Sequence, residues 1–238
     1  MRFIPHVLVL ALIFVTPLWD ALESRRLKAS ADPRKRVKWY VKIVVAGWLL
    51  AALVVWISGG WRSVMTIGAR APWMPSSDAA RGFAVGAIFS IVALQIVMLL
   101  KLRGNEAARR KLAKAIASLW FILPVTREER RWFFFVSITA GICEEIVYRG
   151  FLMHYLIGAP AALSVTLAAI VSSLIFGLGH IYQGVRGAIG TTILGFVFAV
   201  LFVITGNLAL PILLHAAIDA RTLLMIPEGV DLAPNATA

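Results

Sequence analysis

The sequence predicts an all-α, polytopic bundle of transmembrane helices. Hydrophobic residues make up 60% of the chain and charged residues 15%, and the mean hydropathy of +0.84 is far above that of soluble domains. Helices are the expected spanning elements, because backbone polar groups in lipid must be satisfied within the segment. Seven apolar segments, most of them near the ~20 residues that a spanning helix needs, occur at 3–19, 41–58, 83–100, 132–157, 160–179, 188–205 and 208–226.

The net charge of +12 follows the membrane topology. Of the 24 Lys and Arg residues, 17 fall in two loops, residues 19–42 and 101–131. The positive-inside rule assigns both loops to the cytoplasm, which puts the N-terminus and loop 59–82 outside and the C-terminus inside. We expect no nucleic-acid partner, because no basic domain remains outside the membrane. We expect an integral protein of the bacterial inner membrane.

The chain divides into three parts by the distribution of polar residues. Residues 1–131 hold the N-terminal spans and the basic loops and carry no polar residue at span depth to which we assign chemistry, so we expect a scaffold. Residues 132–226 hold three acidic residues, all of them inside apolar segments. An ionisable residue in a span indicates a functional site. This part is the expected catalytic core, and residues 227–238 form a tail.

Two adjacent glutamates lie on different faces of the fourth span. Glu144 and Tyr148 are four residues apart, as are Glu145 and Arg149, so each pair shares a stripe and the two stripes differ by about 100°. Glu145 can pair with Arg149, which favours a structural role. Glu144 has no basic partner on its stripe, and we expect it to act as a general base.

Two histidines bring further ionisable groups to the same region. His180 lies at the end of the fifth span, one turn beyond Phe176, and two intervening glycines allow close helix approach. His215 and Asp219 repeat the four-residue step on the last span and face one direction. A single histidine in a helix bundle often only hydrogen-bonds a backbone carbonyl or a hydroxyl, but six ionisable residues on three spans favour a shared, water-filled site.

The order of these motifs resembles the CAAX-protease and bacteriocin-processing (Abi) family of intramembrane endopeptidases. The matching strings are Glu144-Glu145-Ile-Val-Tyr-Arg149, Phe176-Gly-Leu-Gly-His180 and His215-Ala-Ala-Ile-Asp219, and the resemblance covers residues 130–226. It implies a helical core that is usually counted as eight spans. It also implies cleavage of a peptide or a lipidated protein at the lipid bilayer, and members of the family include prenyl-protein endopeptidases.

The resemblance implies a role for each motif residue. Glu144 would activate water with help from His180, and Glu145, Arg149 and Phe176 would support the motif helices. His215 and the residue four positions later would stabilise the oxyanion. Many relatives carry Asn at that later position, whereas this chain has Asp219, for which we favour a role as a charged acceptor that orients His215.

The resemblance favours catalysis without a cofactor or metal. No His-Glu-x-x-His helix occurs; if zinc is bound, Glu144, His180 and His215 are the expected ligands. Glu144 lies about 18 Å of helix rise past Trp132, so water must reach it through a cavity, which we expect to open to the cytoplasm.

Two other functions are compatible with the same residues. A proton-coupled transporter also places ionisable groups in its spans, although the paired inverted halves typical of such transporters are missing from the sequence. A catalytically silent relative could act as a membrane scaffold or immunity factor. Only a protease releases peptide fragments and only a transporter moves ions.

Overall fold

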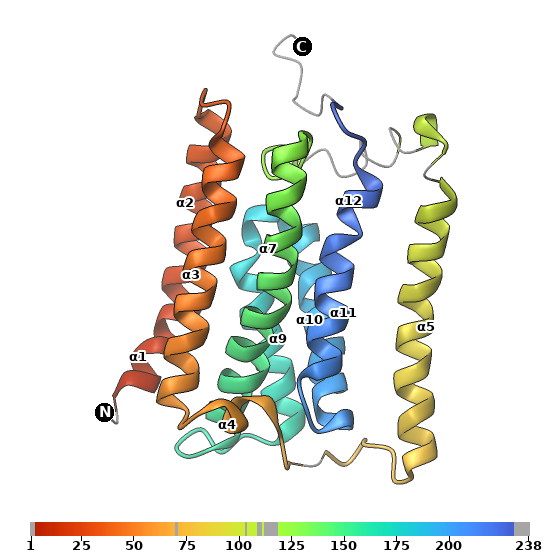
Figure 1. The fold of residues 1–238 in the computed structure, drawn as a ribbon. Coiled ribbons are helices and arrows are strands. Elements are labelled where there is room, and N and C mark those ends of the chain that lie inside the picture. The colour runs from red at the N-terminus through yellow and green to blue at the C-terminus, as the bar shows by residue number, and fades with distance from the viewer. Residues whose placement is uncertain (1–2, 70, 103, 109–110, 112–118, 231–238) are drawn as a thin grey trace.

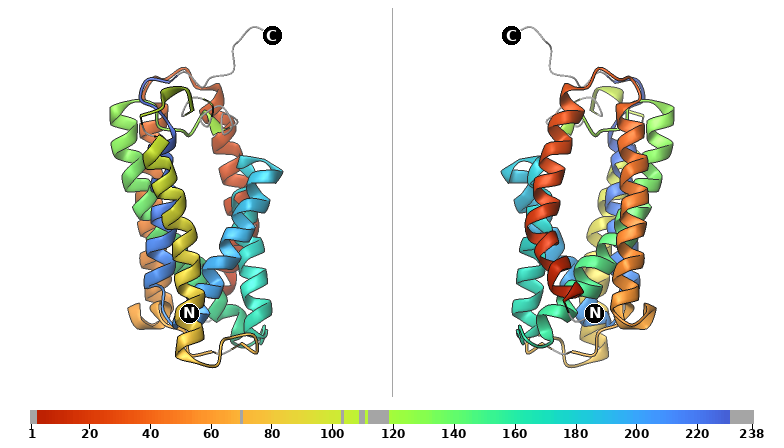
Figure 2. Two further views of the ribbon diagram at one scale, coloured as in Figure 1. Left: turned by 90° about the vertical axis from the view of Figure 1, so that its right-hand side faces the viewer. Right: turned by 90° about the vertical axis from the view of Figure 1, so that its left-hand side faces the viewer.

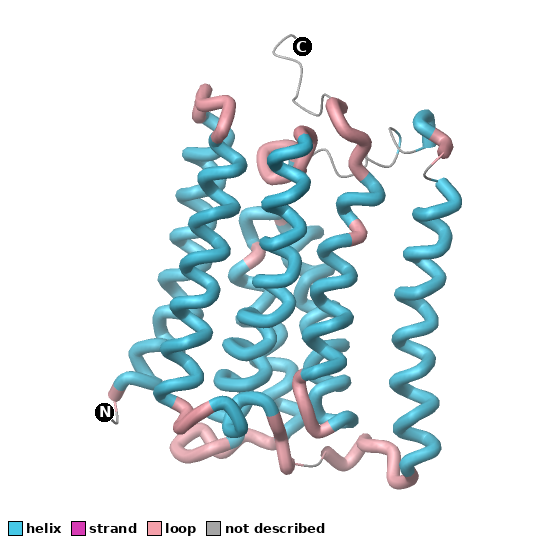
Figure 3. Tube along the Cα trace, in the orientation of Figure 1, coloured by secondary structure: helices cyan, strands magenta, loops and turns pink. Residues whose placement is uncertain are grey.

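The helices form two layers that face each other across the length of the molecule (Figures 1 and 2). The computed structural model describes residues 3–69, 71–102, 104–108, 111 and 119–230. One layer contains α3, α7, α11 and α5, and the other contains α2, α9 and α10 (Figure 2). Helices account for nearly all of the regular structure in the described ranges (Figure 3).

The N-terminal half supplies three long helices. The first is continuous and consists of α1 (Ile4–Leu10), a wider π-helical turn η1 (Ala11–Val15) and α2 (Thr16–Ala29). The second is α3 (Lys35–Ile57), and the short α4 (Trp61–Met65) and α5 (Asp78–Leu102) follow.

The C-terminal half begins with another continuous helix, formed by α7 (Arg127–Glu145), a π-helical segment η3 (Ile146–Leu152) and α8 (Met153–Ile157). The remaining elements are α9 (Val165–Gly179), the 3-10 turn η4 (Ile181–Gln183), α10 (Val185–Thr205), α11 (Ala209–Ala220) and α12 (Thr222–Met225).

Each of the seven apolar segments predicted from the sequence is helical in the structure, which confirms the all-α class. Among the described residues, four helices are long and apolar enough to cross a membrane: Ile4–Ala29, Lys35–Ile57, Asp78–Lys101 and Val185–Thr205. Helix α9 is apolar but shorter. The structure therefore shows a helical bundle, and the number of seven to eight spans stays a prediction.

The segments that connect the helices are divided between the two ends of the bundle as the charge pattern predicts. The connection from α2 to α3, the start of α7 and the end of α12 lie at one end, and the start of α1, α4 and the segment before α5 lie at the other (Figure 1). The basic segments thus share one end, which we call the basic end.

Helix α7 lies in the middle of its layer, between α3 and α11, and its N-terminus is capped. Thr126 and Glu129 form a reciprocal capping box at its N-terminus, which satisfies two backbone amides of the first turn. Further along, a Cβ atom at Gly141 would lie 2.8 Å from the Cβ atom of Ala216 on α11. This close approach of α7 and α11 determines where Glu145, one turn later, meets α11.

Candidate active site

Glu145 and Arg149 form a fully buried ion pair on the helix that runs from α7 into η3. Arg149 Nη1 lies 2.9 Å from Glu145 Oε1, and both side chains are 0% exposed. Arg149 Nη2 donates to the carbonyl oxygen of Gly195 on α10 at 2.9 Å, and the guanidinium lies 4.4 Å from the ring centre of Phe176. The ion pair expected from the four-residue spacing is present, and it joins α7 to both α9 and α10.

His215 is held by Glu145 and by two aromatic rings. Its Nδ1 lies 2.8 Å from Glu145 Oε1, and because a carboxylate only accepts, Nδ1 carries the proton and donates. The imidazole is stacked on Phe198 with ring centres 4.9 Å apart, and Phe176 meets it edge-on at 5.9 Å. The buried carboxylate of Glu145 therefore fixes the tautomer and the orientation of His215.

The other nitrogen of His215 is directed toward two further carboxylates. Nε2 lies 3.8 Å from Glu144 Oε2 and 3.7 Å from Asp219 Oδ2. Both distances are longer than a hydrogen bond, so the short contact to this imidazole comes from Glu145. Sequence reasoning gave Glu145 only the pairing with Arg149, since nothing local shows that α11 passes beside it. The orienting role expected of Asp219 stays a prediction.

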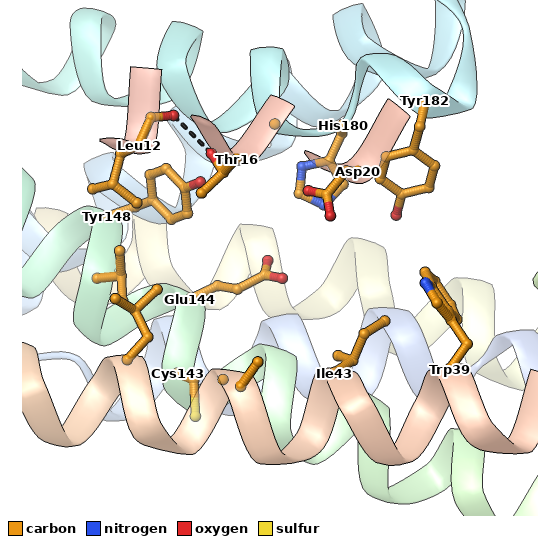
Figure 4. Close-up of a pocket in the computed structure, with 15 residues that line it drawn as sticks. Leu12, Thr16, Asp20, Trp39, Ile43, Cys143, Glu144, Tyr148, His180 and Tyr182 are labelled. Atoms are coloured by element: carbon orange, nitrogen blue, oxygen red, sulfur yellow. Dashed lines mark hydrogen bonds between the residues drawn. The ribbon is translucent and has the colours of Figure 1, made fainter. Parts of the chain in front are cut away.

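Glu144 lies on the wall of a cavity between the two layers, with a volume of about 220 Å³. The Glu144 side chain extends into this cavity from α7, and His180 faces it from the opposite layer (Figure 4). The Oε2 atom of Glu144 is buried and has no hydrogen-bond partner. The cavity is lined by Leu12, Thr16, Asp20, Trp39, Ile43, Ala46, Gly47, Leu50, Cys143, Glu144, Val147, Tyr148, Gly179, His180 and Tyr182.

His180 presents a hydrogen-bond acceptor to this cavity. It follows the C-terminus of α9, and its Nδ1 lies 2.8 Å from the carbonyl oxygen of Phe176. A carbonyl oxygen only accepts, so Nδ1 carries the proton, and whenever the ring is neutral Nε2 is the acceptor. The turn that positions His180 depends on Gly177, where a Cβ atom would clash with Thr192 of α10.

The cavity leads toward the basic end. Trp39 borders it and also borders a second cavity of about 250 Å³. The second cavity is lined by charged residues of α2 and α3, which include Glu23, Arg26, Lys38 and Lys42. The cavity that contains Glu144 is thus next to a charged cavity near the basic end.

The structure adds one acidic residue that sequence reasoning missed. Asp20, on α2, lies beside His180 and faces the same cavity as Glu144 (Figure 4). In the sequence Asp20 is close to Arg25 and Arg26, and this pattern indicates a charge at the membrane surface. The sequence feature that could have identified Asp20 is its spacing of four residues from Thr16, which places both polar side chains on one stripe of the first helix. The segment expected to be scaffold therefore supplies one wall of the site.

A metal centre is not evident in the part of the chain that the structure describes. Within it, His, Cys, Asp and Glu side chains form no group of three that could hold a metal ion. Glu144, His180 and His215, the set expected to bind zinc if it is present, do not form such a group in this arrangement.

The fold and the site together define a helical integral membrane protein with a cluster of ionisable groups buried at the depth of its apolar helices. Residues 126–221 match the family described as Type II CAAX prenyl endopeptidase Rce1-like. This segment is therefore similar to a family of membrane proteases, which confirms the resemblance drawn from the three motifs over these residues. No curated protein and no solved structure gave a significant match.

Proposed function

We propose that this chain is an intramembrane endopeptidase in which Glu144 activates the water that attacks the peptide bond. The observation that carries the proposal is the position of Glu144. Its carboxylate enters the cavity between the two layers, 3.8 Å from His215 Nε2 and opposite His180. The match of residues 126–221 to a family of prenyl endopeptidases supports the same reaction.

The first chemical step is the addition of water to the scissile carbonyl carbon. Glu144 takes a proton from the water through its carboxylate, whose side chain is 31% exposed and lines the cavity. His180 faces Glu144 from the opposite wall of the same cavity, and we assign it to help position this water molecule. This arrangement supports the assistance that the family resemblance assigns to His180.

The second requirement is stabilisation of the oxyanion that forms on the carbonyl oxygen. His215 is suited to this role when its Nε2 is protonated, because Glu145 holds the ring through Nδ1 at 2.8 Å. Glu145 is in turn held by Arg149. We assign Glu145 and Arg149 as positioning residues that act through His215, and Asp219, 3.7 Å from Nε2, as the carboxylate that favours the charged imidazole.

The substrate that fits this site is a peptide or lipidated protein reaching the cavity from the basic end. The cavity walls that face Glu144 are mainly apolar, with Leu12, Ile43, Ala46 and Leu50 among them. By the positive-inside rule the basic end is cytoplasmic, which makes this a cytoplasm-facing site in a bacterial inner membrane. A direct glutamate mechanism needs no metal.

The test is cleavage by purified protein reconstituted in lipid. Wild type and Glu144→Gln are incubated with farnesylated and leader-containing peptides, and fragments are identified by mass spectrometry. We expect wild type to release a C-terminal fragment and Glu144→Gln to release none. Thermal unfolding in detergent serves as the control that the variant is folded.

Three results contradict the proposal in different ways. Equal turnover by Glu144→Gln and wild type would show that this carboxylate is not the general base. If no peptide in the panel is cleaved while the protein dissipates a proton gradient across the vesicle membrane, the chain is a transporter. If neither cleavage nor transport occurs, it is a silent scaffold.

A further inference from the structure

The cavity holds more hydrogen-bond acceptors than the attack of water requires. Glu144 and Asp20 contribute carboxylates and His180 contributes Nε2, and all three side chains face one space (Figure 4). Asp20 interacts electrostatically with both His180 and Glu144. The proposed attack of water uses Glu144 and His180, so Asp20 is an additional acidic group without a role in that step.

No lysine or arginine pairs with these carboxylates in the described part of the chain, and His180 is the basic side chain that interacts with Asp20. Within it, neither Asp20 nor Glu144 forms an ion pair with Lys or Arg. Two basic residues pair with other carboxylates: Arg149 with Glu145, and Lys42 with Glu23 at 2.7 Å. A cavity with two such carboxylates attracts a hydrogen-bond donor or a cation.

Peptide hydrolysis supplies a cation at this point of the reaction. Water adds its oxygen to the carbonyl carbon and its proton to Glu144. When the C–N bond breaks, the nitrogen takes that proton, and it takes a second one from the new carboxylic acid. The products are a carboxylate and an α-ammonium group, and no co-reactant is needed.

We propose that Asp20 binds the amino group of the departing peptide, on the opposite side of the cavity from Glu144. The inference rests on the proposed endopeptidase function and adds a residue to it from outside the segment that matches the family. Asp20 lies on α2, beside His180 and toward the basic end from Glu144. The released fragment therefore leaves past Asp20 toward the charged cavity that Trp39 borders.

The experiment compares two tripeptides as inhibitors of cleavage by the full-length protein in lipid. One is Val-Ile-Met with a free α-amino group, and the other is the same peptide with an acetylated amino group. In wild type we expect the free amine to inhibit about tenfold more strongly, since it alone can form a charge-assisted hydrogen bond.

The variants assign that preference to one carboxylate. In Asp20→Asn the two tripeptides should inhibit equally, with kcat reduced and KM for the intact substrate within a factor of about three, a difference of less than 1 kcal/mol. Asp20→Glu should restore part of the preference for the free amine. Asp78→Asn removes a carboxylate that is 93% exposed at the far end of α5 and should behave as wild type.

Equal inhibition by the two tripeptides in wild type overturns the proposal, whether or not Asp20→Asn folds. A preference that persists in Asp20→Asn also overturns it. Both results leave the endopeptidase function standing, provided that Glu144→Gln abolishes cleavage. Failure of wild type to cleave any peptide would instead remove the underlying function.

Discussion

Glu145 holds His215 across the interface between α7 and α11, with 2.8 Å between Oε1 and Nδ1. The same oxygen also accepts from Arg149 at 2.9 Å. One buried carboxylate thus balances a guanidinium and orients an imidazole. The site consequently depends on a residue that never enters the cavity, and changes to Glu145 should affect both stability and rate.

Replacing Glu145 with Gln should destabilise the protein strongly. The substitution leaves the guanidinium of Arg149 buried without an anionic partner, which typically costs roughly 3–5 kcal/mol. The control is Glu128→Gln, which breaks an ion pair with the exposed Arg34 and should cost about 1 kcal/mol or less. Thermal unfolding in detergent measures both variants, and similar melting temperatures would contradict the buried role of Glu145.

Gly195 on α10 provides the space into which the guanidinium of Arg149 fits. A Cβ atom there would lie 2.8 Å from Arg149 Nη2 and 2.9 Å from the ring of Phe176. We expect Gly195→Ala to cost about 1–3 kcal/mol through this overpacking and to lower the rate of cleavage.

The matched control for this change is Gly190→Ala on the same helix. No atom lies within 4 Å of a Cβ placed at Gly190, so the substitution should leave stability unchanged or raise it slightly, because alanine is the better helix former. Equal melting temperatures for the two variants would show that Arg149 does not need the space at Gly195.

Glu129 makes the start of α7 sensitive to pH. Burial raises its pKa, but hydrogen bonds from the backbone amides of Thr126 and Val125 and from Arg36 outweigh burial and hold the pKa below its ordinary value of 4.5. A carboxyl with a lowered pKa in the folded state stabilises the fold above its unfolded pKa, and this contribution is lost as the pH falls through the folded pKa.

Glu129→Gln should therefore lower the stability by about 1–2 kcal/mol at pH 7. The difference from wild type should begin to shrink as the pH falls below about 4.5 and should disappear below the lower folded pKa, where folded wild type also loses the charge. Thermal unfolding of both proteins at pH 7 and pH 4 measures this, and a difference that is independent of pH would contradict the assignment.

Removal of metal ions should leave cleavage unchanged. Glu144 accepts the proton from water directly in the proposed mechanism, so exhaustive dialysis against a chelator, followed by an assay in metal-free buffer, should retain full turnover. Loss of activity that zinc alone restores would contradict the direct mechanism and would make the zinc ligand set of Glu144, His180 and His215 the better account.

The sequence predicted the helices and the local faces of the site well, because both depend on interactions within a few residues. The spacing of Glu145 and Arg149 predicted their ion pair, and the charge pattern predicted which segments share an end. Contacts between chain segments that are far apart in sequence were harder to predict. The contact between Glu145 and His215 depends on the close packing of Gly141 against Ala216, and no periodicity within one helix reveals it.

Asp20 was missed for a related reason. A carboxylate near the end of an apolar helix and close to basic residues has the pattern of a charge at the membrane surface. Only the packing of α2 beside α9 and η4 brings it next to His180. The boundary drawn at residue 131, between expected scaffold and expected core, cannot anticipate a cavity whose walls come from both parts.

The most direct test of the central claim is the rate constant for cleavage, in a single turnover, by Glu144→Gln compared with Glu128→Gln. Both changes neutralise one glutamate of α7, but Glu128 lies at the exposed start of the helix. We predict a decrease of at least about a hundredfold for Glu144→Gln, the size expected for loss of a general base, and none for Glu128→Gln. Equal rate constants for the two folded variants would contradict the claim that Glu144 activates water.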